Sequence, residues 1–240
     1  MLPDRSFPSD FLLPRILYRD GLMLVIDKPA GLPVHANPGA KRGEGGESLE
    51  DYFDALRFGL PRAPALAHRL DRDTTGCLVL GRHPKALRKL HKLFFEGRID
   101  KTYWAICAGV PEKLSGKIDV ALKKGTEKAG WKMRTALPDD EDAQAAVTTY
   151  RTLKIKNGLS FIEAKPKTGR THQIRVHLAS IGAPILGDPL YGDLSAHDRA
   201  GPIMLHARRV VIPISNAKDP VTVEAPPPEW MTEALARFDP

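Results

Sequence analysis

The six residues from His68 to Asp73 bring together two carboxylates, two guanidinium groups and an imidazole. Apolar runs flank this segment, at 66–67 and at 77–80. A polar loop between two buried strands is a place where a rigid scaffold presents reactive groups. Asp71 lies between arginines, and neighbouring cations favour the ionised form of a carboxylate. An ionised, positioned carboxylate acts as a nucleophile or an electrostatic stabiliser. The alternative is a turn held by structural ion pairs.

A second basic segment, over 165–178, runs from a predicted strand through a glycine turn into a helix predicted over 168–182. Free N–H groups, the helix dipole and side-chain charge together favour anions at a helix N-terminus. Apolar residues at helical spacing would pack one face of this helix on a sheet. We therefore expect Arg170 and Arg175 to point elsewhere, where either clamps a phosphate or pairs with Asp71. A solvated, basic helix start is the alternative.

The net charge of +7 is concentrated in the two segments that carry these motifs. Residues 61–105 hold ten Lys or Arg against four Asp or Glu, and residues 151–178 hold seven against one. Each segment is therefore +6, and the rest of the chain is negative. A clustered basic surface indicates a polyanionic partner, which for a cytoplasmic enzyme points to nucleic acid. An ordinary basic protein with solvated lysines is the alternative.

Other classes of protein are disfavoured by what the chain lacks. It has no run of 18 apolar residues and no secretory signal, so we expect no membrane partner. Cys77 and Cys107 lie in apolar runs and are expected to be free thiols in a reducing cytosol. His172 and His177 are five residues apart and form no metal-ligand spacing, so no metal is expected. Each histidine is then a hydrogen-bonding part of the fold or a polar wall of a cleft.

Strand patterns outnumber helix patterns, and the predicted fold is α+β, a single domain on a large mixed, mainly antiparallel sheet with flanking helices. Strands are predicted at 16–18, 22–27, 77–80, 101–107, 146–155, 159–165, 203–214 and 220–224, with an antiparallel excursion over 115–145. Helices are predicted from Ser48, with Asp51 completing a capping box, from Pro84, and after the prolines at 226–228. Residues 1–15 are an N-terminal extension, and residues 16–240 form the catalytic domain.

Several long motifs, in order along the chain, resemble those of pseudouridine synthases of the RluA type. They are Leu24–Gly31, His68–Gly76, Lys101–Tyr103, Gly169–Leu178, Pro184–Gly192 and Leu205–Ala207. The resemblance runs from about residue 16 to the C-terminal prolines. It implies isomerisation of uridine in RNA to its C-glycoside, with no cofactor and no metal. Thr75 stands where the family often has Ser, which is a conservative difference.

The resemblance also implies roles for individual residues. Asp71 would be the nucleophile, with Tyr103 against the flipped base and a motif arginine paired with the aspartate. Of the two candidates we favour Arg175 for that pair. The substrate-binding set would then be Arg69, which helps to hold the flipped state, Arg170 at the RNA backbone, Leu205 in the apolar pocket wall and His172.

Many relatives carry a separate N-terminal RNA-binding module, and this chain is expected to lack one. The catalytic domain itself would then contact RNA, either ribosomal or transfer RNA, and we expect a monomer. Attack on the sugar, attack on the base and proton loss from the ribose all remain open, and Tyr103 is a candidate base for the last. A silent RNA-binding protein and a nuclease are the rival functions.

Overall fold

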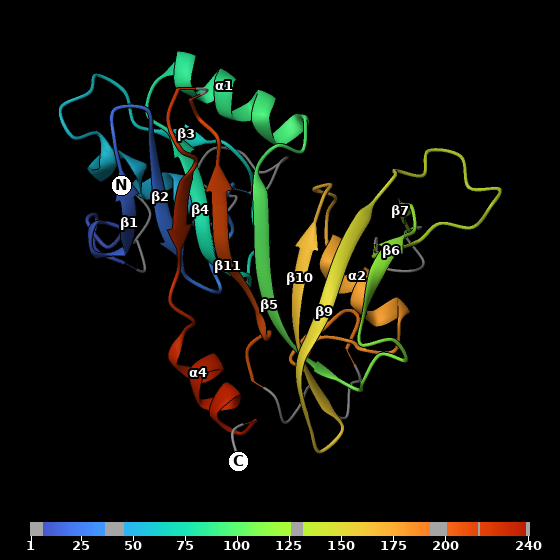
Figure 1. The fold of residues 1–240 in the computed structure, drawn as a ribbon. Helices are drawn as coiled ribbons and strands as arrows, with labels where there is room; N and C mark the ends of the chain where they lie inside the picture. Colours follow the sequence, from blue (N-terminus) through green and yellow to red (C-terminus); the bar gives the residue numbers. More distant parts are fainter. Residues whose placement is uncertain (1–6, 37–45, 126–131, 193–200, 216, 239–240) are drawn as a thin grey trace. The chain divides into compact units, whose positions relative to one another are not determined.

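The computed structural model describes residues 7–36, 46–125, 132–192, 201–215 and 217–238 (Figure 1). The chain divides into two compact units. The first unit comprises Met1–Ile99 and Arg209–Pro226, and the second comprises Asp100–Arg208 and Pro227–Pro240. Strand β11, Leu205–Ile212, has residues in both units. In the part of the chain that the structure describes, no helix is long and apolar enough to span a membrane.

The first unit is built on antiparallel strands, of which β2 and β4 are the most deeply buried. The order β1-β2-β4 places β2 in the middle, and β3 and β12 pair with β4 and β11. Every residue of β4 is buried, as are five of the six residues of β2. The bounds of these strands are β1 Ile16–Arg19, β2 Met23–Lys28, β3 Ala65–Leu66, β4 Thr75–Gly81 and β12 Val221–Glu224.

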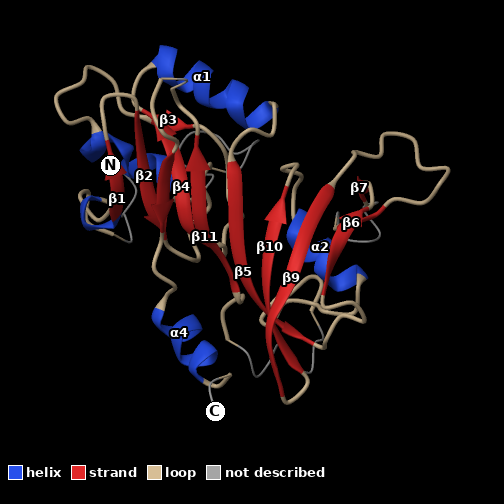
Figure 2. Ribbon diagram, viewed as in Figure 1, coloured by secondary structure: helices blue, strands red, loops and turns tan. Residues whose placement is uncertain are grey.

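Helix α1, Pro84–Phe95, packs on β4 in this unit (Figure 2). Proline at its first turn and the His83 side chain, which accepts from the Ala86 N–H at 3.2 Å, begin the helix as predicted. Its buried face joins an apolar core that includes Met23, Val25, Val79, Leu90 and Leu93. Two 3-10 helices, η1 Leu13–Arg15 and η2 Leu49–Leu56, complete the unit. The capping box predicted at Ser48 and Asp51 is present, although it starts a 3-10 helix.

The second unit holds an antiparallel sheet in the order β5-β10-β9-β6. A small hairpin of β7 and β8 lies apart from it in the hydrogen-bonding pattern. The bounds are β5 Asp100–Ala108, β6 Ser115–Asp119, β7 Leu122–Lys124, β8 Met133–Thr135, β9 Val147–Lys156, β10 Leu159–Pro166, α2 Gln173–Ser180 and α4 Glu229–Ala236. The α+β prediction with a large, mainly antiparallel sheet is confirmed, and both cysteines are free and buried.

Helix α2 is shorter than the sequence pattern predicts, because a turn occupies the residues before it. His172 has a left-handed backbone, with φ of 53°, and the helix begins only at Gln173. The Gln173 side-chain oxygen accepts from the Thr168 hydroxyl at 2.7 Å and from the Arg170 N–H at 3.0 Å. These bonds hold 168–172 as a turn, so the basic motif precedes the helix rather than forming its first turns.

Candidate functional site

The loop that carries Asp71 is closed by a main-chain hydrogen bond. The Thr74 N–H donates to the Asp71 carbonyl at 3.2 Å. Thr74 is buried, while Asp71 is half-buried and Arg72 and Asp73 are exposed. The Arg72 side chain reaches back to the Gly31 carbonyl at 3.0 Å. The loop is therefore a compact turn with a half-buried Asp71 and an exposed Asp73.

A fully buried lysine ties this loop to the end of β2. The Lys28 ammonium donates to the carbonyls of Pro29 at 2.7 Å, Arg72 at 2.7 Å and Thr74 at 3.1 Å. Burial lowers the pKa of Lys28 to about 8, and the negative charges of Asp73 and Asp71 oppose that shift. Three carbonyls satisfy the three donors of an ammonium, so this cation is compatible with its burial. Lys28 is thus the anchor of the Asp71 loop.

His68 and helix α1 support the other side of the loop. The His68 Nε2 accepts from the Val79 N–H at 3.0 Å, and its ring stacks on Phe94 with centroids 4.4 Å apart. The His91 side chain is hydrogen-bonded to the Leu66 carbonyl at 3.1 Å. His68 is a hydrogen-bonding part of the fold, which is one of the two roles predicted for the histidines. Arg69 follows it and is exposed.

In the second unit, Arg175 forms a buried bidentate ion pair with Asp188. The guanidinium Nε and Nη2 donate to the two carboxylate oxygens at 2.7 Å each, and both side chains are almost wholly buried. Burial alone would raise the pKa of Asp188, but the Arg175 hydrogen bonds and the N–H groups of Leu190 and Tyr191 outweigh it and lower that pKa. The pair fixes the plane and direction of the guanidinium.

Tyr191 links this ion pair to His172. The Tyr191 ring lies 5.2 Å from the Arg175 guanidinium carbon, and its hydroxyl is hydrogen-bonded to His172 Nδ1 at 3.0 Å. The same hydroxyl accepts from the Met133 N–H at 2.9 Å. The basic motif and the 184–192 motif, which are separate in sequence, thus form one network.

The expectation that Arg175 would face away from packed structure is wrong. Every residue from Gln173 to Leu178 is buried, so helix α2 has no solvated face over that span. Arg175 tolerates burial because Asp188 neutralises it. Within the same helix His177 is also a part of the fold, since it is hydrogen-bonded to the Thr148 hydroxyl at 2.9 Å and to the Val120 carbonyl at 3.0 Å. Burial lowers the pKa of His177.

Three further predicted residues lie in the second unit. Tyr103 is buried in β5, opposite Ala164 of β10. Leu205 is buried at the first position of β11. Arg170 is exposed, and its side chain donates to the Ala145 carbonyl at 3.2 Å.

The structure therefore gathers His172 and Arg175 in one network of the second unit, with Asp71 and Arg69 on one loop of the first. The pairing of Asp71 with Arg175 stays a prediction. Sequence reasoning missed the roles of Lys28, Asp188 and Tyr191. A sequence signal for them was present, because all three lie in motifs that carry the family resemblance. Residue spacing alone, however, does not indicate which carbonyl or charged group each of them contacts.

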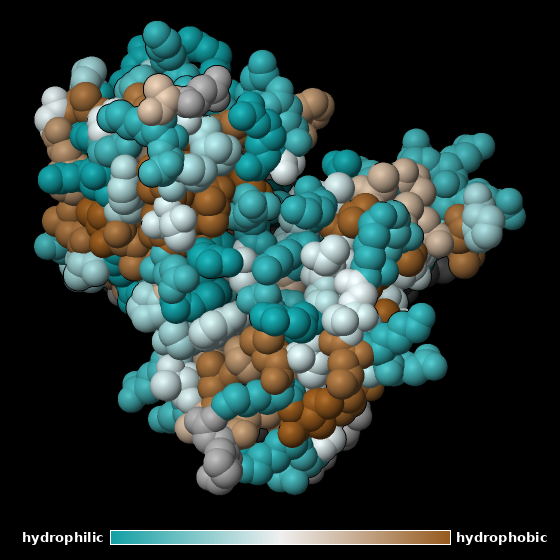
Figure 3. Space-filling view, in the orientation of Figure 1, coloured by the Kyte–Doolittle hydropathy of each residue, from teal (hydrophilic) through white to brown (hydrophobic). Residues whose placement is uncertain are grey.

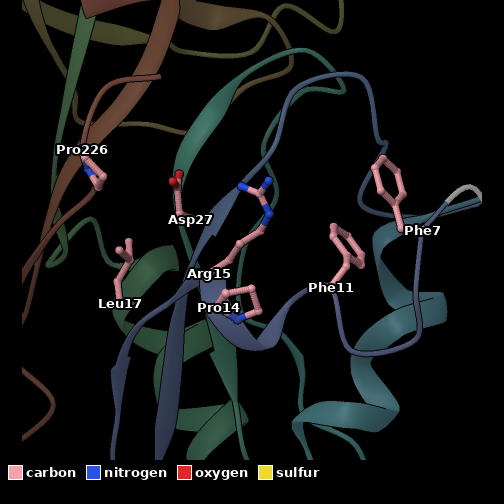
Figure 4. A pocket seen from close by; sticks show the side chains of 7 residues that line it. All are labelled: Phe7, Phe11, Pro14, Arg15, Leu17, Asp27 and Pro226. Carbon is pink, nitrogen blue, oxygen red and sulfur yellow. The ribbon is translucent and has the colours of Figure 1, made fainter. Parts of the chain in front are cut away.

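A hollow of about 500 Å³ opens in the first unit and contains none of the predicted site residues (Figure 4). Arg15 and Asp27 are the charged residues of its lining. Burial raises the pKa of Asp27, although the Arg15 charge opposes the shift. The hollow is lined by Phe7, Phe11, Pro14, Arg15, Leu17, Asp27 and Pro226. Among the described residues, no group of three or more His, Cys, Asp and Glu side chains is arranged to hold a metal ion.

Comparisons with known proteins agree on one family. Residues 22–180 match the sequence model described as RNA pseudouridylate synthase. An uncharacterized RNA pseudouridine synthase of Zymomonas mobilis is 44% identical over 92% of this chain and 97% of its own. The mitochondrial pseudouridylate synthase RPUSD4 of Xenopus tropicalis is 31% identical over 93% of this chain and 80% of its own. The solved structure of human RNA Pseudouridylate Synthase Domain Containing 4 has a TM-score of 0.79 and 28% identity, covering 96% of this chain and 95% of that one.

Proposed function

We propose that this chain, which belongs to the RNA pseudouridylate synthase family and is therefore an RNA-modifying isomerase, acts on uridines of ribosomal or transfer RNA without a cofactor. In this reaction the N1–C1′ bond of uridine breaks, a C5–C1′ bond forms, the proton on C5 leaves, and N1 takes up a proton. The atoms balance without any oxidant or co-substrate.

Asp71 is the proposed nucleophile. The observation that carries this assignment is the anchoring of its loop: Lys28 fixes the main chain at Arg72 and Thr74, and the Asp71–Thr74 turn closes it. A carboxylate on a rigid turn needs little reordering before it reacts. Attack on the sugar, attack on the base and ribose deprotonation are all compatible with this placement.

The other predicted residues divide between the base and the RNA backbone. Tyr103 offers a ring on which an extruded uracil stacks, and stacking offsets part of the cost of leaving the helix. Arg175 is the proposed partner of Asp71, as the family resemblance implies. Arg69, Arg170, His172 and Leu205 complete the proposed substrate contacts.

One observation supports ribosomal RNA as the target. A protein named ribosomal large subunit pseudouridine synthase D, from Zymomonas mobilis, is 35% identical over 79% of this chain. Mapping pseudouridine in total RNA from cells with and without this gene identifies the modified position. A site that is lost with the gene, and restored by wild-type protein but not by Asp71→Asn, assigns the target.

Release of tritium from RNA labelled at uridine C5 tests the activity directly. Wild-type protein should release tritium without cleaving the RNA, and Asp71→Asn should release none while RNA affinity stays within about tenfold. Asp73→Asn is the matched control, since it removes an exposed carboxylate two residues away, and it should keep most activity. Strand cleavage would indicate a nuclease, and binding without release would indicate a silent RNA-binding protein. Substantial turnover by Asp71→Asn removes Asp71 from the mechanism.

A further inference from the structure

Phe95, the last residue of helix α1, is the most exposed large apolar side chain among the described residues. Its exposed fraction is 94%, and the next is Leu137 at 65%. A single exposed apolar residue needs no explanation by itself. Phe95 is different because of the side chains that surround it on the helix.

Cationic side chains share the outer face of α1 with Phe95. Arg88 and Lys92 precede it by seven and three residues, which is the spacing of neighbours on one face of a helix. Lys85 and Lys89 are also exposed on the outer surface. Figure 3 shows mostly hydrophilic side chains over the part of the first unit where α1 lies. Phe95 therefore lies at the edge of a basic surface and not in an apolar patch.

The acidic residue on this surface does not neutralise it. From Pro84 to Arg98 the chain has five Lys or Arg and one acidic residue, Glu96. Glu96 lies 3.7 Å from the Lys92 ammonium and 3.6 Å from the Arg98 guanidinium, and both cations are at least half exposed. Exposed pairs of this kind are weak and are screened by salt. The outer face of α1 keeps a net positive charge.

The inner face of α1 holds this surface in a fixed position relative to the Asp71 loop. Leu90 and Leu93 are buried in the core, Phe94 stacks on His68, and His91 is hydrogen-bonded to the Leu66 carbonyl. These contacts connect the helix to the strand and loop that lead to Asp71. A ligand on the outer face would therefore be held at a constant distance from the reactive carboxylate.

We propose that the outer face of α1 is a second RNA-binding surface, separate from the catalytic loop, in which Lys85, Arg88, Lys89 and Lys92 contact phosphates and Phe95 stacks on an unpaired base. Proteins that bind single-stranded RNA use this combination: a basic surface contacts the phosphate backbone, and an aromatic ring stacks on a base. A protein partner would be better served by apolar neighbours around Phe95, and these are cations. The inference rests on the proposed function for the identity of the RNA.

Two variants and their controls test the surface by fluorescence anisotropy. The probes are a fluorescein-labelled single-stranded oligouridine and an abasic ribose-phosphate oligomer of the same length. Phe95→Ala should weaken oligouridine binding about tenfold and leave the abasic probe unaffected. Ile155→Ala, at an exposed apolar residue of β9, is the matched control and should change neither. Both side chains are exposed, so neither substitution should unfold the protein.

The charges are tested by the salt dependence of binding. Replacing Arg88, Lys89 and Lys92 with Ser should reduce the slope of log affinity against log salt by about 2, because each phosphate contact contributes about 0.7. The control removes the same charge elsewhere, by Lys113→Ser, Lys154→Ser and Lys218→Ser, and should lower the slope less. Equal slopes for the two triple variants would overturn the proposal.

Tritium release from total RNA of cells lacking the gene separates this surface from the catalytic reaction. Phe95→Ala should raise KM and leave kcat unchanged. If wild-type protein binds RNA but releases no tritium, the proposed function is wrong. The anisotropy results still test the RNA-binding surface on α1 in that case. Oligouridine affinity unchanged by Phe95→Ala, or a shift from dimer to monomer in light scattering with RNA affinity retained, would show that Phe95 serves another purpose and overturn the proposal.

Discussion

Asp188 accepts two hydrogen bonds of 2.7 Å from the guanidinium of Arg175, in a place where both side chains are almost wholly buried. A buried arginine is costly unless its charge is compensated. The compensation comes from a different motif, thirteen residues further along the chain. The 169–178 and 184–192 motifs therefore depend on each other. The orientation of Arg175 and the conformation of the loop around Asp188 cannot be understood from one motif alone.

Replacing Asp188 with Asn should destabilise the protein by about 3–5 kcal/mol, because it leaves the buried Arg175 charge without a counter-charge. Urea denaturation followed by circular dichroism measures the loss. Glu96→Gln is the control, since it breaks an exposed pair with Lys92 and should change stability little. If both variants lose the same small amount, the Arg175–Asp188 pair does not stabilise the fold.

The pH dependence of stability should report the buried Lys28. Its pKa is about 8 in the folded chain against 10.5 ordinarily, so between these values the unfolded chain binds more protons. Stability therefore rises with pH across this window. The contribution is fully present above pH 10.5 and is lost as the pH falls through about 8.

Lys28→Met should flatten that rise, by up to about 3 kcal/mol over the window, whereas the exposed Lys218→Met should leave it unchanged. The measurement is the free energy of unfolding at pH 7.5 to 10.5 for all three proteins, over a range set by the two pKa values. Lys28→Met should also lower kcat, since the Arg72 and Thr74 carbonyls lose their donor. A variant with the wild-type pH profile and wild-type kcat would contradict both roles.

Two substitutions of Tyr103 separate stacking from proton transfer. If the ring only stacks, Tyr103→Phe should keep most of the activity and Tyr103→Ala should lose it. If the hydroxyl moves a proton, both should fail at the chemical step by about a hundredfold or more. Single-turnover tritium release, with binding measured separately, distinguishes these outcomes. Wild-type activity in Tyr103→Ala would exclude Tyr103 from the site.

Arg170 should contribute more to RNA affinity than any single cation of α1. It is exposed, and its N–H and its side chain are both tied to neighbouring groups, at Gln173 and Ala145. Its charge is thus held in place before RNA arrives, and less ordering is needed on binding. Arg170→Ala and Lys89→Ala are compared by anisotropy across a salt series. A loss from Arg170→Ala no greater than that from Lys89→Ala would place the RNA on a different face.

Much of the fold could be predicted from local patterns, because strand alternation, the capping box at Ser48 and the proline at the start of α1 are short-range signals. The start of α2 could not, since the Gln173 side chain folds back onto Thr168 and Arg170 and replaces helical turns with a bend. The same contrast between local patterns and tertiary contacts applies to the candidate site. Asp71 is proposed from the charges around it and the apolar runs that flank it, and its role stays a prediction. Two of the three partners of Lys28 lie 44 and 46 residues away and the partner of Arg175 lies 13 residues away, so these contacts depend on tertiary structure.

The hydrogen bonds from Lys28 to the Asp71 loop all go to main-chain oxygens, and every residue type has a main-chain oxygen. The identities of the side chains at positions 72 and 74 are therefore not read by this anchor. Arg72 is exposed, and its side chain donates to the Gly31 carbonyl at 3.0 Å, so exchanging it removes one side-chain contact of the loop but leaves the Lys28 anchor in place. The side chains beside Asp71 can thus be exchanged, by evolution or by design, while the main-chain contacts with Lys28 are kept.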